Sequence, residues 1–243
     1  MIQDIIQGKK WSRMFIAAFR FRRGMVPIFI VALLIIWGQG LSAQTPSRIN
    51  FENDRVGTFP SGWDSREMSS ATEIYSVLSE GEKKFLRADA KGVSVQIGYE
   101  KKWVLKEFPT LQWQWRAVLF PSNTNEREKS GDDSVLGLYV VFGHWPFIKS
   151  LKYIWSDTLP IGASFNSPFS KSSKIIVVRS GRALMGKWVS ERRDILADYE
   201  KLFGDDKAPV TSGVAILTDS DNTDSHAIGD YADIEFIGPA GTK

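Results

Sequence analysis

Residues 213–223 read GVAILTDSDNT, and residues 231–236 read YADIEF. The apolar run Val214–Leu217 is typical of a buried strand. The loop that follows it is dense in oxygen-bearing side chains, and in the second stretch every other residue is apolar, which predicts a strand with one buried face. A buried strand, a polar loop and a closing half-buried strand together predict a β fold with a candidate binding site at its rim.

The same patterns recur upstream. Residues 93–99 and 111–117 alternate apolar with polar side chains, while 138–142 and 175–178 are continuous apolar runs. The first pattern predicts half-buried strands and the second predicts fully buried ones. Clusters of Gly, Pro, Ser and Asn separate these runs and predict turns.

One segment has helical spacing instead. Its apolar residues fall on one face of a helix, at Ile195, Leu196, Tyr199, Leu202 and Phe203. This spacing predicts an amphipathic helix over residues 191–203, with Ser190 as its N-cap and Gly204 just past its end. Many strands and one helix predict an antiparallel β-sandwich of the jelly-roll, galactose-binding or concanavalin-like kind.

The N-terminus looks like a targeting segment. An apolar run at residues 25–37 follows six Lys and Arg side chains, and small residues precede position 44. This layout predicts a signal peptide at residues 1–43 and a periplasmic or secreted protein. The alternative is an inner-membrane anchor formed by residues 25–37, and membrane contact is expected only through this segment. Residues 44–243 are then expected to form a single β-sandwich domain.

The net charge bears on whether nucleic acid is a ligand, and the cysteine content bears on how the domain is stabilised. Six of the 31 basic residues lie before residue 44, against one of the 28 acidic residues, so the remainder carries a net charge of −2. A basic groove for nucleic acid is therefore not expected. The chain has no cysteine, so an exported domain would be stabilised by its core or by a metal rather than by disulfides.

The acidic loop is the first candidate site. Asp219, Asp221 and Asn222 offer hard oxygen ligands close together, and Asp230 follows. Calcium prefers such ligands, so a structural Ca²⁺ site is one interpretation. Because Asp, Asn, Ser and Thr are also the usual turn residues, an ordinary turn is the other.

Two further constellations carry charge. Asp132 and Asp133 precede a predicted buried strand. If both faced one site, their mutual repulsion would raise the pKa of one carboxyl and supply an acid. The alternative is that both lie in a solvated loop. Arg179 follows a β-branched run, and Glu191 and Arg193 lie near the predicted helix start. These three are candidates either for ligand binding or for an internal ion-pair network.

Aromatic residues suggest a third kind of site. Trp113 and Trp115 share one strand face and are expected in the core. Trp145 lies in a predicted loop and is the better candidate for an exposed platform. The two histidines are isolated in sequence and no Gly-x-Ser-x-Gly motif is present, which argues against a serine hydrolase or a zinc enzyme.

The order of these segments resembles a known family. The resemblance spans residues 49–237 and is carried by KSGDD at 129–133, YVVF at 139–142, VRSG at 178–181, Trp188 with Glu191 and Arg193, Asp198-Tyr199 with Phe203-Gly204, and TDSDNT at 218–223. Together these resemble bacterial exported proteins of the domain of unknown function 3047 family. The resemblance implies an exported β-rich domain and implies no activity.

A second resemblance concerns the ends of the domain. Residues 49–54 and 59–63, with DIEF at 233–236, are similar to the opening and closing strands of jelly-roll carbohydrate-binding modules. The resemblance implies that the first and last strands pair. It also implies that Glu52 and Asp233 could share a structural calcium ion.

The leading hypothesis is a non-enzymatic module that binds a carbohydrate or envelope glycan. The first alternative is a glycoside hydrolase or polysaccharide lyase that uses Asp132 or Asp133 with Glu191, Arg179 or Asp219. The second alternative is an envelope domain whose aromatic patch binds a protein partner. The sequence leaves the oligomeric state open.

Overall fold

The computed structural model of the protein describes residues 48–205, 207 and 210–239. All of these belong to one compact unit. The predicted signal peptide or anchor, residues 1–43 with its apolar run at 25–37, lies outside the described residues. Within the described part of the chain, no helix has the length and hydropathy that a membrane span requires.

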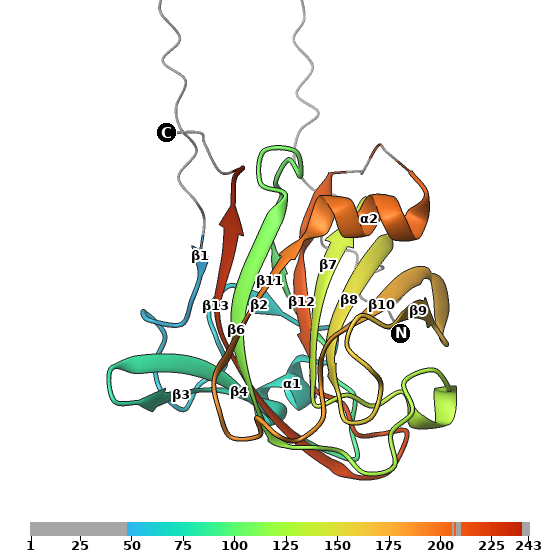
Figure 1. The fold of residues 1–243 in the computed structure, drawn as a ribbon. Coiled ribbons are helices and arrows are strands. Elements are labelled where there is room, and N and C mark those ends of the chain that lie inside the picture. Colours follow the sequence, from blue (N-terminus) through green and yellow to red (C-terminus); the bar gives the residue numbers. More distant parts are fainter. Residues whose placement is uncertain (1–47, 206, 208–209, 240–243) are drawn as a thin grey trace, which may run out of the picture. The chain divides into compact units, whose positions relative to one another are not determined.

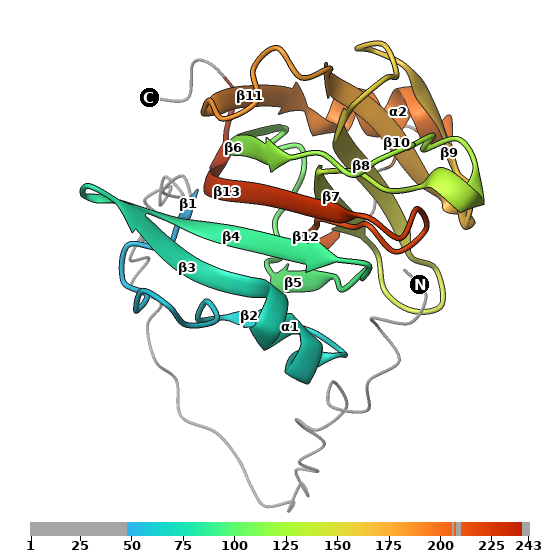
Figure 2. The same ribbon diagram turned by 90° about the horizontal axis from the view of Figure 1, so that it is seen from below.

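The unit contains two β-sheets (Figure 1). The first has the order β11-β6-β13-β4-β3, with β1 paired to β13, and all its pairs are antiparallel. Its strands are β1 (Arg48–Ile49), β3 (Tyr75–Glu80), β4 (Lys83–Lys91), β6 (Thr110–Leu119), β11 (Val189–Asp194) and β13 (His226–Ile237). Figure 2 shows β3, β4, β13 and β6 following one another in one layer.

The second sheet has the order β2-β5-β12-β7-β8-β10-β9. Its strands are β2 (Trp63–Asp64), β5 (Ile97–Glu100), β7 (Leu136–Phe142), β8 (Lys149–Ser156), β9 (Ser164–Ser167), β10 (Ser170–Ser180) and β12 (Thr211–Leu217). Only β8 and β10 pair in parallel. The protein is thus mainly β and antiparallel-rich, as predicted.

The core lies between the two sheets. Trp113 and Trp115 on β6 are fully buried, which confirms their predicted role. The Trp113 ring centroid is 5.4 Å from that of Tyr153, and the Trp115 centroid is 6.3 Å from that of Trp155. These contacts join β6 of the first sheet to β8 of the second, so the large aromatic rings pack the two layers together.

The ends of the domain meet as the second resemblance implied. Ile49 of β1 lies opposite Ile234 of β13 in an antiparallel pair. The register of β13 against β6 shifts between Ala232 and Glu235, and Asp233 has a φ of 53°. Such a bulge re-aims a side chain, and here Asp233 forms an ion pair with Arg48.

The predicted helix is present but shorter at its start. Helix α2 (Ile195–Phe203) begins after β11, in which Ser190 pairs with Gln114 of β6. Sheet pairing therefore outweighs the local capping signal at Ser190. The N-cap is Asp194, whose Oδ1 accepts a hydrogen bond of 2.9 Å from the Ala197 backbone N–H. Gly204, with a φ of 64°, ends the helix as predicted.

Two short helical elements were not predicted. Helix α1 (Met68–Ile74) precedes β3, and a 3₁₀ turn, Lys129–Gly131, precedes Asp132. Gly131 is required in that turn because a Cβ there would lie 2.7 Å from the Asn125 backbone nitrogen. The turn fixes where the chain enters the strand β7, and so places the acidic residues that follow.

Candidate functional site

A pocket of about 340 Å³ lies on the second sheet. Lys152 on β8, Tyr139 on β7 and Leu217 at the end of β12 line it, together with residues of segment 167–172, which runs from the end of β9 into β10. We call it the Lys152 pocket. In β8, Leu151, Tyr153 and Trp155 belong to the core cluster. Because strand side chains alternate between faces, Lys152 points to the other face of the sheet.

Strand pairing brings two distant carboxylates to this pocket. Leu217 at the end of β12 lies opposite Gly137 near the start of β7. The residues just before β7 and just after β12 are therefore neighbours, although they are far apart in the sequence. Asp132 and Asp219 both line the pocket as a result. Sequence patterns had singled out both residues, but they could not place them together.

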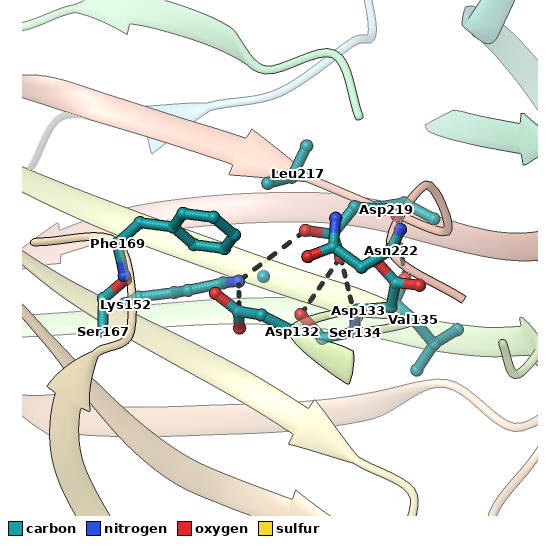
Figure 3. A network of polar contacts seen from close by, with 12 residues as sticks. Asp132, Asp133, Ser134, Val135, Lys152, Ser167, Phe169, Leu217, Asp219 and Asn222 are labelled. Carbon is teal, nitrogen blue, oxygen red and sulfur yellow. Dashed lines mark hydrogen bonds and ion pairs between the residues drawn. The ribbon is translucent and has the colours of Figure 1, made fainter. Parts of the chain in front are cut away.

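Lys152 lies between the two carboxylates (Figure 3). Its Nζ is 3.9 Å from Asp132 Oδ1 and 3.9 Å from Asp219 Oδ2, and none of the three side chains is more than 6% exposed. The other oxygen of Asp219, Oδ1, accepts a hydrogen bond of 2.6 Å from the Ser134 backbone N–H. Both ion-pair distances exceed hydrogen-bond length. The ammonium is thus paired with both charges, while neither carboxylate takes one of its N–H groups at hydrogen-bond distance.

Burial governs the protonation of this cluster. It raises the pKa of Asp219 to about 7, and the negative charge of Asp132 adds to the effect while Lys152 opposes it. The pKa of Asp132 is also raised, chiefly by burial. Burial alone would lower the pKa of Lys152, but Tyr139, Asp219 and Asp132 outweigh it and raise that pKa. Lys152 is therefore protonated at neutral pH.

Asp133 faces away from its neighbour Asp132. Its carboxylate accepts hydrogen bonds from the backbone N–H groups of Asn222 (3.2 Å) and Thr223 (2.8 Å), and from the Thr223 hydroxyl (2.6 Å). The two adjacent aspartates therefore do not form an acid pair at one site. Asp133 instead holds the acidic loop against the start of β7, and that loop carries Asp221 and Asn222 into the pocket lining.

Two oxygens of the lining have no hydrogen-bond partner among the described residues. They are Asp132 Oδ1 and Asn222 Oδ1, and both are buried acceptors. Buried polar atoms are normally hydrogen-bonded, so an open acceptor in a pocket calls for a ligand that donates. Asp221 also lines the pocket and is an exposed residue. Partial burial of its carboxyl raises its pKa, and the negative charge of Asp133 adds to this shift.

An aromatic ring lies at the pocket on segment 167–172. Phe169 is 48% exposed, and Lys129 Nζ lies 5.5 Å from the centroid of its ring. Phe169 and Lys152 both line the pocket, and Figure 3 draws both side chains. The pocket thus combines a charged, hydrogen-bonding floor with a flat apolar surface.

Three further site candidates, Arg179, Glu191 and Arg193, lie outside the Lys152 pocket. Arg179 of β10 forms an ion pair of 2.8 Å with Glu191 of β11, and the Trp115 indole N–H donates to the same carboxylate. Arg193 pairs with Asp198 of α2. None of Arg179, Glu191 and Arg193 belongs to the pocket lining as described. These contacts form internal ion pairs, which is one of the two interpretations that the sequence allowed. The Arg179–Glu191 pair joins a strand of one sheet to a strand of the other.

The remaining metal candidates are also dispersed. Asp230 is fully buried and bound by Arg87 (2.7 Å) and Arg116 (2.8 Å). Asp233 pairs with Arg48, and Glu52 is exposed. Within the described residues, no group of three or more His, Cys, Asp or Glu side chains is arranged to hold a metal ion. Calcium stays a prediction from the sequence.

Trp145 lies in the loop between β7 and β8. It is 52% exposed, and Phe147 beside it is 78% exposed. Trp145 is not part of the Lys152 pocket as described. The pocket and this aromatic loop are therefore two separate candidate surfaces.

Lys152, Tyr139 and Phe169 are among the pocket residues that sequence reasoning did not single out as site candidates. Lys152 carried a readable signal, because a lone lysine between Leu151 and Tyr153 in a strand-like run needs a charged partner if the run is buried. Tyr139 and Phe169 carried none, since apolar and aromatic residues in such segments are more often part of the core.

Comparison with known proteins places the chain in a family. Residues 61–235 match the family described as protein of unknown function (DUF3047), so the chain belongs to that family, as its motif order suggested. No curated protein matches the chain.

Several solved structures resemble the fold. The carbohydrate recognition domain of Emp47p is 10% identical with a TM-score of 0.46, and the match covers 83% of this chain and all of that one. TmCBM61, solved in complex with β-1,4-galactotriose, is 8% identical with a TM-score of 0.35, and the match covers 79% of this chain and 99% of that one. These are distant similarities, and the function proposed below rests on the pocket.

Proposed function

We propose that the protein is an exported β-sandwich module that binds a carbohydrate in the Lys152 pocket. One observation carries the proposal: Lys152 Nζ lies 3.9 Å from both Asp132 Oδ1 and Asp219 Oδ2. Two hydrogen bonds of about 2.8 Å that meet at one oxygen at roughly 90° place their outer atoms about 4 Å apart. A single hydroxyl can therefore accept from Lys152 and donate to a carboxylate at the same time.

A hydroxyl is the simplest group that both donates and accepts. A purely anionic group would accept from Lys152 but would be repelled by the two aspartates, and a purely apolar group would leave the buried Asp132 Oδ1 without a hydrogen-bond donor. Sugars present several hydroxyls at fixed spacing on one rigid ring. The floor of the pocket consequently favours a sugar over an acid or a hydrocarbon.

The rest of the pocket fits the same ligand class. Phe169 offers an exposed flat ring, against which the apolar face of a sugar can pack. The volume of about 340 Å³ is at the lower end of the range for small-molecule sites and admits one or two sugar rings. Binding is expected to be modest in strength, because much of the polar surface must be desolvated.

Screening on a glycan array, followed by calorimetry on the best ligands, tests the proposal. Asp132→Asn keeps the shape of the side chain and removes its charge, and Phe169→Ala removes an exposed ring, so both variants should fold. We expect each to weaken binding about tenfold or more, as the loss of a charge-assisted hydrogen bond or a packing surface does.

The matched control is Asp224→Asn. Asp224 is an exposed carboxylate on the same loop but outside the lining of the Lys152 pocket, so we expect no effect on binding. A second control is Trp145→Ala in the aromatic loop. If Trp145→Ala abolishes binding while Phe169→Ala leaves it intact, or if no glycan binds the folded protein, the proposal is wrong.

Catalysis is the second candidate, and the raised pKa of Asp219 favours it. A carboxyl with a pKa of about 7 beside a second carboxylate is the pairing that glycoside hydrolases use as acid and base. The acid–base pair would be Asp132 with Asp219, which is one of the pairings that the sequence suggested, and not a pairing with Glu191 or Arg179. Release of reducing ends from a bound glycan, lost in Asp219→Asn, would support hydrolysis; a bound glycan that stays intact would exclude it.

A further inference from the structure

We infer that the carbohydrate bound in the Lys152 pocket carries a free amine, as an amino sugar does. The inference rests on the proposed function and adds the chemical class of the ligand. It starts from the open atoms of the lining: Asp132 Oδ1 and Asn222 Oδ1 are buried and have no hydrogen-bond partner within the described chain. Both are acceptors, so the complementary ligand must bring donors to both.

The carboxylates of the pocket outnumber the cation on its floor. Asp132, Asp219 and Asp221 line it, and buried Lys152 is its only buried lysine or arginine within the described structure. The lining holds a second lysine, Lys171, which is exposed as Asp221 is, so three acidic side chains face two basic ones. Asp133 lies behind the loop and adds negative potential at Asp132 and Asp221. A ligand cation would offset this excess.

The hydroxyl and the amine of the ligand would bind at different parts of the pocket. Lys152 lies between Asp132 and Asp219 at the floor, where a ligand hydroxyl can bridge them. Asn222 and Asp221 belong to the acidic loop, which forms another wall. A protonated amine on the ring has three N–H donors and one positive charge, so along this wall it can donate to Asn222 Oδ1 and pair with the Asp221 carboxylate. A neutral hydroxyl supplies one donor, and a uronic acid supplies further negative charge.

Matched oligosaccharides test the inference. Cello-, chito- and chitosan tetrasaccharides share one β-1,4-linked glucose backbone and differ at position 2, which carries a hydroxyl, an acetamide or an amine. The corresponding galactose and galactosamine sugars extend the test to the other common ring stereochemistry. By calorimetry at neutral pH we expect the amine-bearing sugar of at least one series to bind about tenfold tighter than its neutral counterpart, with a preference that shrinks as salt is added.

The variant Asp221→Asn tests whether the acidic loop causes the preference for an amine-bearing sugar. Asp221 is exposed, so the variant should fold, and we expect it to lose most of the amine preference while it keeps binding to the neutral sugar. Asp224→Asn, three residues along the same loop, should keep the preference. Equal or tighter binding of the neutral sugars in both series overturns the inference and leaves the proposed function standing. If no amine-bearing sugar binds, the inference is overturned as well, whereas the proposed function is overturned by the absence of binding to every glycan or by binding that depends on Trp145 and not on Phe169.

Discussion

At the floor of the pocket, a buried ammonium is balanced by two buried carboxylates. Removing Lys152 would leave two buried carboxylates without a counter-charge, which typically costs about 3–5 kcal/mol, whereas removing one carboxylate still leaves an ion pair. The cluster is thus a stability risk unless it serves a ligand, because apolar residues of similar volume would pack the same space at lower cost. Gly137 contributes to the arrangement, since a Cβ there would lie 3.2 Å from Lys152 Cε.

The protonation of Asp219 gives a prediction for stability against pH. Its pKa is about 7 in the folded protein against an ordinary value of 3.8, so between these values the folded state holds a proton that the unfolded state has lost. Stability therefore falls as pH rises from about 4 to about 7, by at most about 4 kcal/mol from this group. The charged groups around it are Lys152, Asp132 and Asp133.

Denaturant unfolding at pH 4, 5, 6 and 7 measures this slope in the wild type and in Asp219→Asn. The amide cannot ionise, so the variant should lose the Asp219 contribution to the fall in stability, and its curve should be flatter. Parallel curves for the two proteins would show that Asp219 titrates near its ordinary pKa.

Among the elements, α2 shows how a local signal and sheet pairing compete. The apolar face of the helix was readable from its spacing, and so was Gly204 at its end. Its start was not, because the six residues of β11 pair with β6 across the whole range Val189–Asp194. Strand β8 was missed for a related reason: Lys152 interrupts its apolar run, and only the carboxylates contributed by other elements make a buried lysine acceptable there.

Asp194 gives a prediction at the scale of the element. Its side chain caps α2 through the Ala197 N–H, so Asp194→Ala should lower the free energy of unfolding by about 1 kcal/mol. Glu200→Ala is the matched control, because Glu200 is exposed on the same helix and its loss should change stability by less than about 0.5 kcal/mol. Urea unfolding measures the free energy of unfolding of both variants. Equal losses would show that the capping hydrogen bond does not stabilise the helix.

At the scale of the molecule, the sequence predicted the sandwich and the paired terminal strands, because period-two alternation reports burial directly. It also singled out Asp132, Asp219, Asp221 and Asn222. It could not separate them from Arg179, Glu191 and Arg193, because the pairing of β7 with β12 decides which charged residues meet. That pairing depends on contacts between segments about 80 residues apart, which local patterns do not encode.

Chelation tests the calcium prediction for the whole domain. Of the carboxylates predicted to bind calcium, Asp219 and Asp221 line the Lys152 pocket, whereas Asp230 and Asp233 have arginine partners. The calcium interpretation predicts that EDTA lowers the melting temperature and that added calcium restores it, and an unchanged melting temperature under both treatments would contradict it. If EDTA lowers the melting temperature and calcium restores it, a bound ion stabilises the fold by mass action, and the calcium interpretation of the acidic loop is correct.

The most direct measurement is a crystal structure of the protein with the tightest-binding glycan from the array. The account predicts a sugar ring in the Lys152 pocket, with one hydroxyl oxygen within hydrogen-bond distance of both Lys152 Nζ and an oxygen of Asp132 or Asp219, and with an apolar face of the sugar on Phe169. A glycan bound at the Trp145 loop, with the Lys152 pocket holding only solvent, would contradict it.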